Sequence, residues 1–188
     1  LFQNGIDRSQ VPSHYITEGH RIIKKVSGID IPFQKLRERC NEIGLTIAER
    51  VKERVKSMEP SERFRHLVQW AIAGNHLDFR TVGTGYDFAV EGIENLLLQQ
   101  VTKGLQVDQV EQIYQRIQMA KTVLFIHDNV GEIAFDKLLI SEIKSYGATV
   151  TSALRGGAIT SDATMEDGVS VGIAEVADQV ICAGPDTL

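Results

Sequence analysis

Cysteine and proline are scarce in this chain of 188 residues, which holds two cysteines and four prolines. Cys40 and Cys182 are far apart in the sequence, so they match neither a zinc-ligand spacing nor a disulfide framework. The simplest interpretation is two buried free thiols in a reducing compartment, and we therefore expect a cytoplasmic protein.

Long apolar runs and an excess of positive charge are lacking as well. No stretch approaches the roughly 18 apolar residues that a membrane span needs, and no signal peptide is recognisable. The 25 acidic residues outnumber the 20 basic ones, which gives a formal net charge of −5. The chain therefore lacks the excess of positive charge with which proteins bind a nucleic acid. We therefore expect neither a membrane nor a nucleic acid as a partner.

What the sequence does have is a helical first half. Apolar side chains recur at steps of three and four from Phe33 to Met58, which predicts one long helix with Asp30 as its N-cap. Further helices are expected before and after it, with a glycine-containing loop at residues 82–85. The expected helical region covers residues 1–107.

The second half alternates short strand-like runs with helices. Strands are expected at residues 123–126, 149–154 and 179–182, with helices over 131–146 and 165–175 between them. This order is typical of a right-handed parallel α/β unit. Four consecutive apolar residues in the first strand favour a strand covered on both faces.

We therefore predict an α/β fold in which residues 108–188 form the α/β part of a single domain. The chain begins with Leu1 rather than methionine and stops six residues after the last expected strand. On these grounds we expect a fragment of a longer chain.

Ligands of open parallel sheets bind beyond the carboxyl ends of the strands, which directs attention to the loops at residues 127–132 and 161–162. Asp128 follows an apolar strand, so we expect its carboxylate near a dehydrated sheet edge, where a divalent cation would offset its charge. Asp128, Asn129 and Asp162 form an all-oxygen set that suits Mg²⁺ or Mn²⁺ better than zinc. The alternative is ordinary turn and helix-cap chemistry.

Other polar residues accompany these loops. Glu132 and Asp136 lie four apart on one expected helix face, either beside the cation or as two solvated acids. Arg155, followed by Gly156 and Gly157, is suited to a phosphate group, or else is a surface arginine before a flexible loop.

Three segments together resemble the damage-control metabolite phosphatases, a metal-dependent family that includes an acidic-residue methyltransferase-like branch. They are Ala-Gly-Asn-His-Leu-Asp-Phe at residues 73–79, Asp-Asn-Val-Gly-Glu at 128–132 with Asp136, and residues 155–167 from Arg-Gly to Glu-Asp. The resemblance runs from about residue 22 to the end of the chain. It implies an α/β/α sandwich with Rossmann-like crossovers and a helical N-terminal region.

The resemblance also implies roles for individual residues. The family's divalent metal maps to Asp128, Asn129 and Asp162, with Mg²⁺ or Mn²⁺ as the expected ion and Co²⁺ or Ni²⁺ as further candidates. Asn75 and Asp78 inherit a substrate-binding role.

Glu132 and Arg155 inherit catalytic roles from the same family. The chain departs from the family pattern at Ala158 and Ser161, where proline and asparagine are usual. It also has no counterpart of the N-terminal Cys-x-x-Cys or of the C-terminal Lys-Gly-Gln-Gly-Asn-like loop.

The resulting prediction is a metal-dependent phosphomonoester hydrolase acting on small phosphorylated metabolites, such as sugar phosphates or phosphopantetheine-like compounds. One alternative is a carboxylate methyltransferase, although the sequence has no glycine-rich turn after its first strand. The other is a non-catalytic module that binds phosphorylated metabolites.

Overall fold

The structure is a computed structural model that describes residues 9–78 and 89–184. Its helices, in chain order, are α1 (Pro12–Ser27), α2 (Gln34–Val55), α3 (Pro60–Gly74), the 3-10 turn η1 (Asn75–Leu77), α5 (Val90–Lys103), α6 (Val110–Met119), α7 (Ile133–Ser145), α8 (Met165–Val171) and the 3-10 turn η2 (Ile173–Glu175). The loop predicted at residues 82–85 lies outside the described residues.

Three parallel strands form the sheet, in the order β1 (Thr122–Ile126), β2 (Thr149–Leu154) and β3 (Gln179–Cys182). Phe125 pairs with Ser152, and Leu154 pairs with Cys182. The α/β fold and the three predicted strands are confirmed. Because β1 and β2 are parallel neighbours, the loops that follow them leave the same edge of the sheet.

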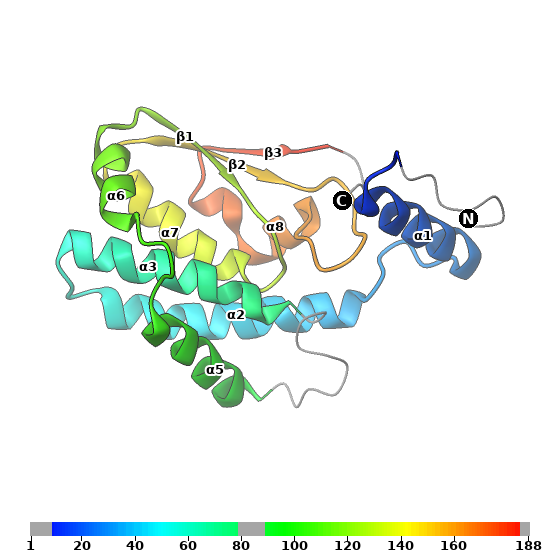
Figure 1. Ribbon diagram of the computed structural model, residues 1–188, viewed down its shortest axis with the longest axis horizontal. Coiled ribbons are helices and arrows are strands. Elements are labelled where there is room, and N and C mark those ends of the chain that lie inside the picture. Colours follow the sequence, from blue (N-terminus) through cyan, green and yellow to red (C-terminus); the bar gives the residue numbers. More distant parts are fainter. Residues whose placement is uncertain (1–8, 79–88, 185–188) are drawn as a thin grey trace.

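Helices α2, α3, α5, α7 and α8 lie on one side of this sheet (Figure 1). Figure 1 shows α7 and α8 directly against the strands, then α2 and α3, with α5 on the far side of that layer. The expectation that the first strand is covered on both faces is wrong for the described part of the chain, because Leu124 is 60% and Ile126 is 70% exposed. An apolar run alone does not distinguish a strand buried on both faces from one that packs on a single face.

Two predicted helices have different bounds in the structure. The N-cap of α2 is Phe33 in a left-handed conformation (φ 60°), so the prediction of Asp30 as the cap was wrong. The helix predicted over residues 165–175 is divided at Gly172, whose φ of 78° ends α8 before η2 begins. Positive φ favours glycine, which explains the break.

A continuous cluster of buried apolar side chains joins the two halves of the chain. Ile43 and Ile47 of α2 belong to the same cluster as Ile140 of α7. The rings of Trp70 in α3 and Phe135 in α7 stack with centroids 5.7 Å apart. Within residues 9–78 and 89–184, none of the helices combines the length and apolar character needed to cross a bilayer.

Candidate metal centre

The loops after β1 and β2 are joined by backbone hydrogen bonds. Asn129 and Asp162 form an isolated antiparallel bridge. The Val130 amide donates to the Ser161 carbonyl at 2.8 Å, and the Ala163 amide donates to the Asp128 carbonyl at 2.7 Å. The structure therefore brings the Asp128–Asn129 pair and the Asp162 loop side by side.

The three predicted metal ligands differ in their exposure. Asn129 and Asp162 are buried, at 2% and 5% exposed, whereas Asp128 is exposed. The expectation of a dehydrated Asp128 was therefore wrong: its side chain lies beyond the strand tip, on an edge that the described residues leave open. An exposed carboxylate beside two buried oxygen-bearing groups is accessible to an ion from solvent.

The chemistry of this donor set fits a hard divalent cation. Two carboxylates and one amide oxygen are the ligand types that Mg²⁺ and Mn²⁺ prefer, and Mg²⁺ keeps several waters of its own. Over the described ranges, His, Cys, Asp and Glu side chains form no group of three or more arranged to hold a metal ion. The proposed set thus depends on the Asn129 amide, whose Oδ1 accepts a hydrogen bond from the Ser161 hydroxyl at 2.9 Å.

Arg155 lies at the same edge. Its Nε is 3.6 Å from Oδ1 of Asp162, and the other oxygen of that carboxylate accepts a hydrogen bond from the Thr160 hydroxyl at 2.9 Å. The Arg155 side chain is about one-third exposed. A partly solvent-facing guanidinium beside the Asp162 carboxylate is suited to an anionic group that approaches the same point.

Asn75 connects the end of α3 to the first loop. Its Nδ2 donates to Oδ2 of Asp128 at 3.2 Å and to Oε2 of Glu132 at 3.1 Å. This contact requires glycine at position 74, because a Cβ there would lie 2.8 Å from the Phe135 ring and 3.1 Å from the Glu132 Cα. The segment at residues 73–79 therefore lies against the loop that follows β1, through Asn75.

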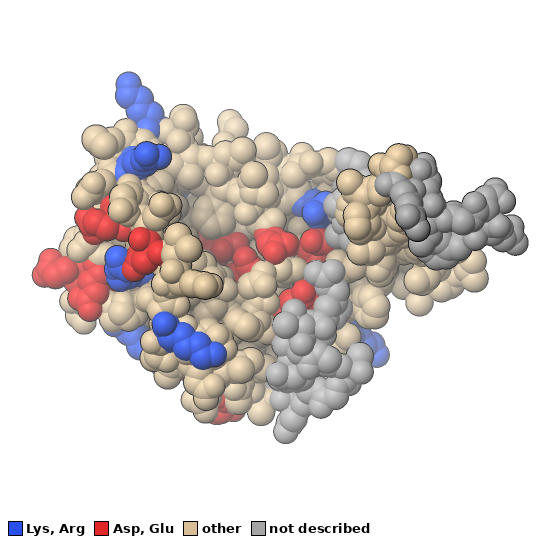
Figure 2. All heavy atoms as spheres, viewed as in Figure 1, with Lys and Arg blue, Asp and Glu red and all other residues tan. Residues whose placement is uncertain are grey.

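Glu132 has an unusual electrostatic environment. Its pKa is raised from 4.5 to about 8: burial is the largest cause, the neighbouring Asp136 and Asp128 carboxylates add to it, and the hydrogen bonds from Asn75 and Asn129 oppose the shift. A cation bound beside these carboxylates would offset the repulsion between their charges. Figure 2 shows a row of acidic side chains across the middle of one face, between the sheet and helix layers.

His127 and Asp136 form a buried pair that the sequence analysis missed. The Nδ1 atom of His127 lies 2.8 Å from Oδ2 of Asp136, and both side chains are almost fully buried. Burial raises the pKa of Asp136, and the histidine opposes that shift. Asp136 is thus not solvated, and a nine-residue separation offers no sequence signal for its pairing with His127.

Asp78, the second predicted substrate residue, is buried at the end of η1. It lies near Cys40, because its charge contributes, after burial, to raising the pKa of that thiol to about 12. Its role toward a substrate stays a prediction.

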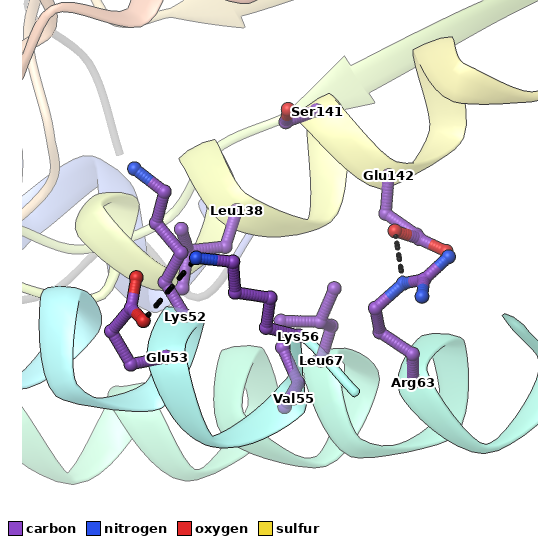
Figure 3. Close-up of a pocket in the computed structure, with 9 residues that line it drawn as sticks. All are labelled: Lys52, Glu53, Val55, Lys56, Arg63, Leu67, Leu138, Ser141 and Glu142. Atoms are coloured by element: carbon purple, nitrogen blue, oxygen red, sulfur yellow. Dashed lines mark hydrogen bonds and ion pairs between the residues drawn. The ribbon is translucent and has the colours of Figure 1, made fainter. Parts of the chain in front are cut away.

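A cavity of about 320 Å³ lies elsewhere in the molecule. The ends of α2 and α3 that form it include Lys56 and Arg63, and α7 contributes Leu138 and Glu142 (Figure 3). Along α2 it is roughly 20 Å, at 1.5 Å per residue, from Asn41, which accepts a hydrogen bond from the Gly131 amide in the loop after β1. This cavity is therefore separate from the candidate metal centre.

Comparisons with known proteins identify the family to which the chain belongs. A family model described as the damage-control phosphatase ARMT1-like domain matches residues 2–188. The chain belongs to this family. The resemblance inferred from the three sequence segments is thereby confirmed.

Relatives of this damage-control phosphatase domain support the same assignment. The chain is 35% identical over 182 residues to the uncharacterized protein MJ0202 of Methanocaldococcus jannaschii, covering 96% of this chain and 58% of that protein. It is 30% identical over 174 residues to a protein of Archaeoglobus fulgidus named damage-control phosphatase, covering 93% of this chain and 58% of that relative.

The fold agrees with a solved structure of the family. The crystal structure of a DUF89 family protein, PH1575 of Pyrococcus horikoshii, superposes with a TM-score of 0.74 and 30% identity, over 88% of this chain and 54% of that one. The damage-control phosphatase domain described here therefore spans little more than half the length of these relatives.

Proposed function

We propose that this chain contributes the metal-binding part of a phosphatase that hydrolyses small phosphorylated metabolites. The observation that carries the proposal is the backbone bridge between Asn129 and Asp162, which joins two loops with oxygen-bearing side chains at one sheet edge. Relatives named damage-control phosphatase support the reaction class. Candidate substrates are sugar phosphates and phosphopantetheine-like compounds.

In this proposal Asp128, Asn129 and Asp162 hold one divalent cation, with Mg²⁺ or Mn²⁺ as the expected ions and Co²⁺ or Ni²⁺ as further candidates. When bound there, the cation supplies Lewis-acid polarisation of the phosphoryl group. The exposed Asp128 is the entry point for the ion, and the buried Asn129 and Asp162 fix its position.

The remaining residues act on the substrate. Arg155 faces the phosphoryl oxygens and offsets the charge that develops on them, since phosphoryl transfer depends mainly on positioning and charge neutralisation. Glu132 orients the attacking water or a substrate hydroxyl, with Asp78 as the other candidate for this role. Asn75 holds Glu132 beside Asp128 through its two hydrogen bonds.

The first prediction concerns the ligand carboxylates. We expect Asp128→Ala and Asp162→Ala each to abolish metal-dependent phosphate release, because a cation held by three protein groups loses one of them. The measurement is a phosphate-release screen over phosphorylated metabolites with Mg²⁺, Mn²⁺, Co²⁺ or Ni²⁺ and a chelator control.

The matched control is Glu111→Ala, which removes an exposed carboxylate of α6 and should leave turnover unchanged. Circular dichroism would establish that all variants are folded. Equal turnover by the wild type and both aspartate variants would contradict the mechanism. Tight binding of a sugar phosphate without turnover by the wild type would instead favour a non-catalytic module.

A further inference from the structure

Arg37, in the first turns of α2, is almost completely buried, with 2% of its surface exposed. A buried guanidinium is costly unless its donors are satisfied. Here Nη1 donates to the Thr160 carbonyl at 2.6 Å, and Nη2 donates to the Asp162 carbonyl at 2.8 Å and to the Asp167 carboxylate. Arg37 therefore binds the backbone of the loop after β2, on both sides of Ser161.

Asn41 lies one helical turn later on the same face of α2. Its Nδ2 donates to Oδ1 of Asp167 at 2.9 Å, and its Oδ1 accepts a hydrogen bond from the Gly131 amide at 2.8 Å. Gly131 belongs to the loop after β1, between Asn129 and Glu132. One face of α2 thus contacts both loops.

Asp167 joins these contacts from α8. Besides Arg37 and Asn41, it accepts hydrogen bonds from the Thr164 amide at 2.9 Å and from the Thr164 hydroxyl at 2.7 Å. Each of these residues is buried, with less than a tenth of its surface exposed. A buried polar network joined by several hydrogen bonds of this kind holds its members in one geometry.

The fit between α2 and the first loop leaves little room. A Cβ on Gly44 would lie 2.3 Å from the Gly131 carbonyl oxygen. The backbone of α2 therefore approaches the Gly131 carbonyl more closely than any residue with a Cβ would allow. Contacts with α2 thus add to the backbone hydrogen bonds that join the two loops directly.

We propose that Arg37, Asn41 and Asp167 form a positioning clamp that sets the geometry of the cation site. The clamp acts through the backbone of Thr160, Asp162 and Gly131, at or near the ligand residues, and none of its three residues is proposed to touch the ion. This inference rests on the proposed function, because it assigns the clamp to the same metal centre.

The test is Arg37→Lys, which keeps the charge but loses the planar fork that reaches two carbonyls and a carboxylate together. Mn²⁺ affinity would be titrated through the electron paramagnetic resonance signal of free Mn²⁺, at a temperature where circular dichroism shows a folded protein. We expect affinity to fall about tenfold or more, since residues that orient metal ligands typically contribute 10–100-fold. We also expect a lower kcat at saturating Mn²⁺.

The matched control is Arg50→Lys on the same helix. Arg50 pairs with Glu94 at 2.5 Å and with Glu91 at 3.6 Å, both on α5. This control should change stability without changing Mn²⁺ affinity. Asn41→Ala supplies a second, independent variant should Arg37→Lys fail to fold, with the same expected loss of affinity.

The outcomes separate the clamp from the proposed function. Folded clamp variants with wild-type Mn²⁺ affinity and kcat would overturn the clamp alone. A wild type that binds Mn²⁺ but releases no phosphate would overturn the proposed reaction. The Mn²⁺ affinity of the clamp variants relative to the wild type would then decide for or against the clamp. A wild type that binds no Mn²⁺ would overturn both.

Discussion

Among single residues, Glu132 links burial to acid–base behaviour. Its pKa rises from 4.5 to about 8 because burial disfavours the charged form and because Asp136 and Asp128 lie close by. A carboxyl group in this state holds a proton near neutral pH until a cation approaches. Metal binding and proton release at this residue are therefore expected to be coupled.

This coupling predicts a pH dependence of stability in the metal-free protein. Since the pKa of Glu132 is higher in the folded than in the unfolded state, its contribution is complete below about pH 4.5 and is lost as pH rises toward 8. Glu132→Gln should flatten this decline, which for one group is at most about 1.4 kcal/mol per pH unit.

Urea unfolding between pH 5 and pH 8 in the presence of a chelator measures the effect. Glu166→Gln is the matched control, since Glu166 is exposed, and its slope should equal that of the wild type. A Glu132→Gln slope identical to the wild type would show that Glu132 is ionised throughout this range.

At the scale of elements, the contact between the end of α3 and the start of α7 decides where Asn75 lies. Gly74 permits this contact because a Cβ would collide with the Phe135 ring at 2.8 Å. The end of α3 therefore packs directly on the start of α7, and this close approach allows Asn75 to reach Asp128 and Glu132.

Gly74→Ala should therefore destabilise the protein, by about 1–3 kcal/mol for overpacking, and should weaken Mn²⁺ binding by displacing Asn75. Urea unfolding and Mn²⁺ titration measure the two effects. Gly92→Ala is the control, because Gly92 in α5 has open space around it and alanine there should stabilise the helix by up to about 1 kcal/mol. Equal stability of the two variants would contradict the close-packing argument.

At the scale of the whole molecule, the helical and α/β parts share one buried cluster. Trp70 of α3 and Phe135 of α7 stack at its centre, and Phe135 has no exposed surface. Removing either ring would leave a cavity shared by both parts. The division of the chain between residues 107 and 108 stays a prediction from the sequence pattern. The buried apolar cluster contains side chains from both sides of this division.

Phe135→Ala should lower the free energy of unfolding by about 3–5 kcal/mol. Because Trp70 is the chain's one tryptophan, its fluorescence reports the α3–α7 contact, and far-ultraviolet circular dichroism reports the helices. Both signals should shift to the same lower urea midpoint if the parts unfold together. Ile113→Ala, at a partly exposed position of α6, should change the midpoint little. Separate midpoints would indicate two independent units.

Much of this architecture could be predicted from local pattern. Strand positions followed from short apolar runs between turn residues, and helices from steps of three and four. The loop sites followed from the rule for parallel sheets, which needs only strand order. Long-range pairs could not be predicted: Arg37 contacts Asp162 across 125 residues, and His127 pairs with Asp136 only because a turn brings them together.

Local sequence pattern was enough to predict the order of the elements and the oxygen-bearing residues at the strand ends, because hydrophobic period and turn chemistry act over a few residues. The exposure of Asp128, the burial of Asp162 and the contact of α2 with both loops became known only from the folded chain. Burial and hydrogen-bond partners depend on which distant segments pack together. Side chains on one face of α2 bind backbone groups about 90 to 125 residues away, and no local sequence pattern predicts such pairs.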